Sequence, residues 1–81
     1  MTFEPNRHQL AFVLPESFRK AEVIFQKRFD DKQEVHLVVE PNRCPRQVVS
    51  TRHLSSGLWH VILDWWDGKR HYWAEKDILV D

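Results

Sequence analysis

The last quarter of the chain constrains the fold most, because it predicts a β-hairpin that is rich in tryptophan. Two runs of β-branched, aromatic and aliphatic residues flank Asp67-Gly68, a dipeptide typical of tight turns in which both central residues take positive φ. This turn would place Trp66 opposite Lys69. A four-residue loop over 66–69 would keep the same residues on each face, whereas an odd-length loop would exchange the faces.

The two faces of this predicted hairpin differ in character. In the expected register His60 opposes Glu75 and Asp64 opposes His71, so the second face is half charged and half apolar. The first face has the composition of a core: Trp59, Val61, Leu63, Trp65, Arg70, Tyr72, Ala74, Lys76, Ile78 and Val80. The second face, where a function is more plausible, carries His60, Ile62, Asp64, Trp66, Lys69, His71, Trp73 and Glu75.

The preceding residues predict further short strands rather than helices. Alternating apolar residues favour strands over 8–14, 21–27, 34–40 and 47–51, and residues 1–8 are interpreted as a polar entry arm. In the third of these strands Val35, Leu37 and Val39 would point inward, and Leu54 would close the edge of the core. Short strands separated by Pro-containing turns indicate an all-β sandwich or a partly open barrel, formed by 1–81 as a single domain.

The size and net charge of the chain limit the kinds of partner that we expect. A chain of 81 residues makes one small domain, and its 12 basic and 12 acidic residues cancel. A neutral domain has no long-range field to attract nucleic acid or an anionic membrane, so neither is an expected partner. The single cysteine, Cys44, cannot form an internal disulfide, and the sequence shows no membrane span or signal peptide.

The titratable residues do not predict an enzyme or a metal site. His60 and His71 share a face but lie on different rungs, each beside a carboxylate, which favours surface ion pairing over metal binding. His8, His36 and His53 have no evident partner and are interpreted as solvated. Cys44 has no base placed beside it, and the acidic pairs Asp30-Asp31 and Asp64…Asp67 fall where loops and turns favour charge.

The aromatic residues divide into a core set and an open question. Trp59, Trp65 and Tyr72 alternate with aliphatic residues and are predicted to be core. Ile62, Trp66 and Trp73 lie side by side on the other face. They are either covered by another part of the fold or form a surface for a partner.

The order of these motifs resembles the extracytoplasmic domain of the FixH (CcoH) family over nearly the whole chain from Leu10. The residues that carry the resemblance are Leu10-x-Phe12 with Pro15, Ala21-Glu-Val-Ile-Phe25, Leu54-Ser-Ser-Gly-Leu-Trp59-x-Val-x-Leu-Asp-Trp65, Asp67-Gly-Lys with Tyr72, and Glu75-x-x-Ile78-x-Val80. Gly57, Trp59, Trp65, Gly68 and Tyr72 match as structural positions. The resemblance implies no metal ligands in this chain.

The resemblance implies a small Ig-like antiparallel β-sandwich of six or seven strands that assists assembly of cbb3-type cytochrome c oxidase and is not an enzyme. It also implies a periplasmic position at a bacterial inner membrane, through an N-terminal helix that this chain lacks before His8. We therefore expect a protein-binding accessory domain that uses no cofactor and that could dimerise. The partner-binding candidates are Ile62, Trp66, Trp73, His60 and His71.

Two alternatives remain open from the sequence. A Trp-rich final hairpin with Asp-Gly also suits a small SH3-like barrel that binds peptide or nucleic acid. A copper carrier would require His60 or His71 to converge with Met1 or Cys44.

Overall fold

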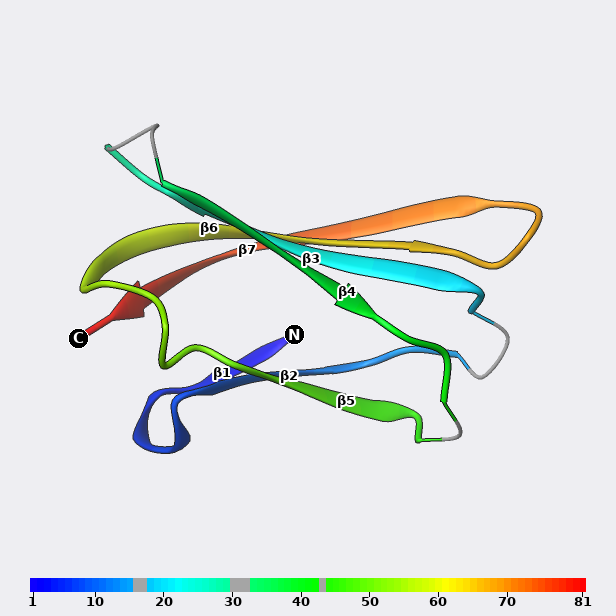
Figure 1. Cartoon of the computed structure of the whole chain (residues 1–81), viewed down its shortest axis with the longest axis horizontal. Helices are drawn as coiled ribbons and strands as arrows, with labels where there is room; N and C mark the ends of the chain where they lie inside the picture. Colours follow the sequence, from blue (N-terminus) through cyan, green and yellow to red (C-terminus); the bar gives the residue numbers. More distant parts are fainter. Residues whose placement is uncertain (16–17, 30–32, 43) are drawn as a thin grey trace.

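Two antiparallel sheets pack face to face in a computed structural model of the chain, which describes residues 1–15, 18–29, 33–42 and 44–81 (Figure 1). The strands are β1 (Thr2–Glu4), β2 (Gln9–Val13), β3 (Lys20–Lys27), β4 (Glu34–Val39), β5 (Arg46–Ser50), β6 (Gly57–Trp66) and β7 (His71–Val80). One sheet has the order β1-β2-β5 and the other β4-β3-β6-β7. This confirms the predicted sandwich. The two sheets form separate layers, which is not the arrangement of the SH3-like barrel considered as an alternative.

The strand order is a variant of the immunoglobulin arrangement. In a constant-type immunoglobulin domain the fourth strand belongs to the same sheet as the first two. Here β4 instead forms a hairpin with β3, in the register Ile24↔His36, and so widens the opposite sheet to four strands. The wider sheet presents a broad outer surface that the three-stranded sheet does not contact.

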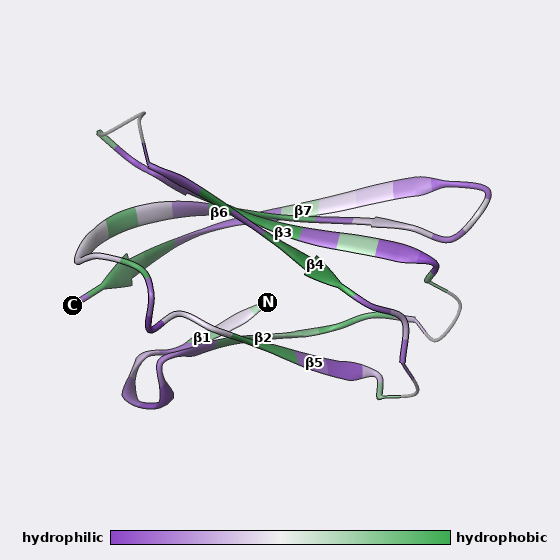
Figure 2. Cartoon of the chain, in the orientation of Figure 1, coloured by the Kyte–Doolittle hydropathy of each residue, from purple (hydrophilic) through white to green (hydrophobic). Residues whose placement is uncertain are grey.

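The core lies between the sheets and follows the period-2 pattern of the strands, which Figure 2 shows as alternating apolar and polar bands. Leu54 is buried, and Val35, Leu37 and Val39 pack against the core with partial exposure, all as predicted. Trp59 is 1% exposed, and its indole N–H donates to the Ser55 carbonyl at 2.9 Å. The buried core is formed by Leu10, Phe12, Leu14, Phe18, Ala21, Val23, Phe25, Leu54, Trp59, Val61, Leu63, Ile78 and Val80.

The expected entry arm contains a strand. Pro5–Arg7 form a 3-10 turn that ends at His8, whose φ of 52° is left-handed, and this reversal returns the chain along β1. β1 pairs with β2 in the register Phe3↔Leu10, and Phe3 packs against the core. The strand was missed because three residues are too few to establish an alternating pattern.

The predicted hairpin turn is displaced by one residue. The central residues are Gly68 and Lys69, because the Asp67 N–H donates to the Arg70 carbonyl at 3.2 Å and Trp66 pairs with His71. Asp67 Oδ1 accepts the N–H groups of Lys69 and Arg70 at 2.8 and 2.7 Å, and only Gly68 in the turn takes positive φ, +98°. The expected pairing of Trp66 with Lys69 is therefore wrong by two residues. The residues of the two strands keep their predicted faces, but Lys69 and Arg70, which were assigned to the faces, lie in the turn.

Burial decreases toward this turn, so two predicted core aromatics are less buried than expected. The β6–β7 hairpin extends beyond the end of the three-stranded sheet (Figure 1). Trp65 is half-buried and Tyr72 is 36% exposed, and their rings stack with centroids 5.5 Å apart. The prediction that Tyr72 is core is wrong because its side of the sheet has no opposing strand there. At the other end of β6, Gly57 has a φ of +136°.

Candidate functional site

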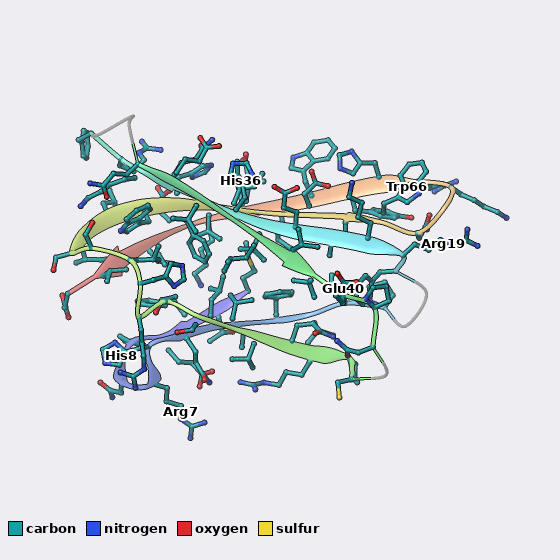
Figure 3. All side chains as sticks on the ribbon, in the orientation of Figure 1. Arg7, His8, Arg19, His36, Glu40 and Trp66 are labelled. Atoms are coloured by element: carbon teal, nitrogen blue, oxygen red, sulfur yellow. The ribbon has the colours of Figure 1, made fainter. Side chains whose placement is uncertain are left out.

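The side of β4-β3-β6-β7 that points away from the other sheet is here called the outer face. Figure 3 shows His36 and Trp66 projecting from it, away from the three-stranded sheet. Because side chains alternate along each strand, the pairing of the four strands fixes its members. They are Lys20, Glu22, Ile24, Gln26, Glu34, His36, Val38, Leu58, His60, Ile62, Asp64, Trp66, His71, Trp73, Glu75, Asp77 and Leu79.

The apolar residues of the outer face form a band across the sheet. Ile24 and Ile62 oppose each other on the two central strands and are half-buried by their neighbours. Trp73 is 65% exposed and Trp66 is 41% exposed, both toward the hairpin end. The structure therefore places the three apolar candidates Ile62, Trp66 and Trp73 together on a face that the other sheet does not cover (Figure 1).

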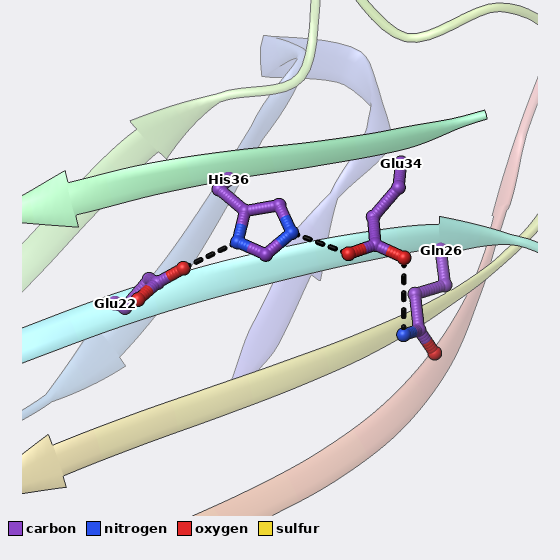
Figure 4. A network of polar contacts seen from close by, with 4 residues as sticks. All are labelled: Glu22, Gln26, Glu34 and His36. Carbon is purple, nitrogen blue, oxygen red and sulfur yellow. Dashed lines mark hydrogen bonds and ion pairs between the residues drawn. The ribbon is translucent and has the colours of Figure 1, made fainter.

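His36 lies between two carboxylates on the outer face, as Figure 4 shows. Its Nδ1 contacts Glu22 Oε1 and its Nε2 contacts Glu34 Oε1, while Gln26 Nε2 donates to the second oxygen of Glu34 at 3.4 Å. Both ring nitrogens can donate at once only in the imidazolium form, so two carboxylate neighbours favour the protonated ring. The hydrogen bond to Glu34 first, and then that to Glu22, raises the pKa of His36.

His36 is exposed on the edge strand β4, as predicted, but the prediction that it has no partner is wrong. Glu34 and His36 are two residues apart on one strand and so share a face, a signal that the sequence did contain. Glu22 is a different case, because its proximity depends on the register between β3 and β4.

The other two histidines of the outer face also pair with carboxylates. His60 Nδ1 lies 2.7 Å from Asp77 Oδ1, and its Nε2 lies 3.5 Å from Glu75 Oε1. His71 Nε2 contacts Asp64 Oδ1. The predicted partners Glu75 and Asp64 are therefore found, but they sit diagonally across the strands. The shift of two residues in the pairing makes Asp77 the residue directly opposite His60.

The described residues contain no group of three or more His, Cys, Asp or Glu side chains arranged to hold a metal ion. Cys44 is exposed in the connection between β4 and β5, where its N–H donates to Asn42 Oδ1 at 2.9 Å. Met1 packs against the core, on the inner side of the sheet. The convergence that a copper carrier would need is thus not present. The acidic pair Asp30-Asp31 lies outside the described residues.

Two open hollows flank the apolar band. The hollow nearer the hairpin turn, about 510 Å³, is lined by Lys20, Glu22, Asp64, Trp66 and His71. The other, about 650 Å³, lies toward the β3–β4 end and is lined by Gln26, Lys27, Arg28, Phe29, Gln33, Glu34 and His60. Both are shallow depressions in a surface rather than enclosed cavities, a shape that suits side chains of a docked partner better than a small molecule.

Comparisons with known proteins do not assign this chain to a family: no family model, curated protein or solved structure matches it. The resemblance to FixH therefore stands on the sequence motifs alone. In the described part of the chain, no helix has the length and apolar character needed to cross a membrane.

Proposed function

We propose that this domain is a non-catalytic protein-binding module and that its outer face is the docking surface. The observation that carries the proposal is Trp73, a large aromatic side chain 65% exposed beside Trp66 and Ile62 on a broad, uncovered sheet. Tryptophan is enriched among the residues that dominate binding energy at protein interfaces. Several apolar residues gathered on one face, rimmed by polar residues, are typical of such interfaces.

Docking would draw its energy from burial of the apolar band. Each large apolar side chain removed from water contributes about 1.5–3 kcal/mol, before the costs of association are subtracted. The histidine–carboxylate pairs around the band are partly or fully exposed, so they contribute less to affinity than to orientation.

The setting we propose follows from the resemblance to FixH: assembly of a cbb3-type oxidase on the periplasmic side of an inner membrane. The motifs over 54–80 support it, and the Ig-like sandwich is compatible with it. Co-purification of the domain, expressed in a bacterium that makes this oxidase, tests the setting. Recovery of oxidase-assembly components would support it, and recovery of only unrelated partners would refute it.

The docking surface is tested by comparing three variants for capture of a partner from an extract of the source cells. Trp73→Ala should lose the partner with little change in Tm, because its side chain is largely outside the fold. Val13→Ala is the matched control, since Val13 is 72% exposed on the other sheet and should retain the partner. Trp59→Ala should instead lose about 3–5 kcal/mol of stability.

Two results would refute the docking surface. One is unfolding of Trp73→Ala, which would show that its side chain is part of the core. The other is equal loss of the partner in Trp73→Ala and Val13→Ala, which would show that capture does not depend on the outer face.

A further inference from the structure

The outer face concentrates negative charge in a chain whose formal net charge is zero. Across the outward positions of the four described strands there is one Lys or Arg, Lys20. The carboxylates at these positions are Glu22, Glu34, Asp64, Glu75 and Asp77. At these strand positions carboxylates therefore outnumber Lys and Arg by five to one, although the composition of the whole chain gives no sign of it; Arg28, from the loop after β3, lies 4.0 Å from Asp77.

Two carboxylates face each other one rung from Trp66, whose own cross-strand neighbours are Lys20 and His71. Glu22 and Asp64 oppose each other directly across β3 and β6, an arrangement of like charges that is destabilising in a sheet. Each is partly compensated from outside the pair, Glu22 by His36 and Asp64 by His71. Both carboxylates line the hollow that Trp66 borders, together with Lys20 and His71.

A cationic side chain fits this hollow. A Lys or Arg entering it would form charge-assisted hydrogen bonds with the two carboxylates and lie against the exposed indole, which attracts cations through its π face. Its positive charge would relieve the repulsion between Glu22 and Asp64. Apolar side chains on either side of the cation would meet Ile62 and Trp73.

We propose that the occupant of the outer face is a cationic segment of a partner protein, in which Lys or Arg residues alternate with large apolar ones. The proposal rests on the docking function proposed above and specifies the chemistry of the partner. A second copy of this chain is disfavoured, because two acidic faces brought together repel. Nucleic acid is disfavoured for the same reason.

Three synthetic peptides of equal length test the charge requirement. They share the same Leu and Phe residues and carry Lys, Ser or Glu at the intervening positions. In titrations of the 15N-labelled domain, the Lys peptide should shift amide signals of β3, β6 and β7 and the indole signals of Trp66 and Trp73. Its affinity should fall with added salt, and the Ser and Glu peptides should bind more weakly.

A pair of variants locates the charge effect. Asp64→Asn keeps the size of the side chain and should weaken binding of the Lys peptide about threefold to tenfold, because a partly exposed charged hydrogen bond contributes about as much as an ordinary one. Glu4→Gln is the matched control, because Glu4 lies on the other sheet, where it pairs with Arg46. It should leave the affinity unchanged.

The results that would contradict a cationic partner differ from those that would contradict the docking function. Equal binding of the Lys and Ser peptides, lost in Trp73→Ala, would overturn the cationic partner and keep the docking surface. If the domain self-associates and Trp73→Ala abolishes the association, a second copy is the occupant, and the proposal of a cationic partner is overturned. Absence of shifts in the outer-face signals with every peptide would also overturn the cationic partner. Capture of the cellular partner tests the docking function independently.

Discussion

His36 shows how strand pairing sets the protonation of a single side chain. The carboxylates of Glu34 and Glu22 occupy both of its ring nitrogens and raise its pKa above the ordinary value of 6.5. Since the folded state holds the proton more tightly than the unfolded chain, the interaction stabilises the fold fully below pH 6.5. The stabilisation is lost as pH rises through the folded pKa.

We therefore expect His36→Gln to lower Tm at pH 6 and to have a smaller effect at pH 9. Thermal unfolding of the two proteins over this range measures the difference. Glu34→Gln provides a direct control, because it removes the strongest of the two hydrogen bonds and should lower the pKa of His36 in an NMR titration. A Tm difference that grows with pH would contradict the imidazolium at this position.

The β6–β7 hairpin shows what a dipeptide signal can and cannot establish. Asp67-Gly68 correctly indicated a turn and thereby the two faces of the hairpin. It did not locate the centre of the turn, because Asp67 acts as an acceptor for two backbone N–H groups instead of taking positive φ. These hydrogen bonds, the one from Arg70 first, lower the pKa of Asp67.

The turn makes Gly68 the residue most sensitive to substitution within the hairpin loop. Its φ is +98°, and an added Cβ would lie 3.0 Å from Arg19 Nε. We expect Gly68→Ala to lower the free energy of unfolding by about 1–3 kcal/mol through backbone strain. Lys69→Ala, at the second central position, should be nearly neutral by denaturant unfolding. Equal effects of the two substitutions would contradict the assigned turn.

For the molecule as a whole, the alternation of apolar and polar residues predicted which side chains face the core. It did not predict which side chains meet across neighbouring strands. The alternation of β4 correctly placed Val35, Leu37 and Val39 on the core side. The meeting of Glu22 with Asp64 and of Glu22 with His36 depends on which strands are neighbours. Strand adjacency across turns of uncertain length is not encoded in periodicity, so the acidic character of the outer face remained hidden.

The same limitation applies to the candidate site. The sequence identified Ile62, Trp66 and Trp73 as side by side but left open whether another layer covers them. Coverage is a property of the division into three and four strands, because the three-stranded sheet packs on the opposite side. The sequence-level resemblance to FixH did not decide it, since it concerns the order of motifs and not the exposure of a face.

Both proposals depend on an outer face that is open in the folded domain, and the solvent exposure of the four indole N–H groups measures this most directly. A soluble paramagnetic agent added to the 15N-labelled domain should broaden the indole signals of Trp73 and Trp66 strongly. The signal of Trp59, which is buried and bonded to Ser55, should persist. Protection of Trp73 and Trp66 equal to that of Trp59 would mean that the outer face is covered and would contradict the docking surface.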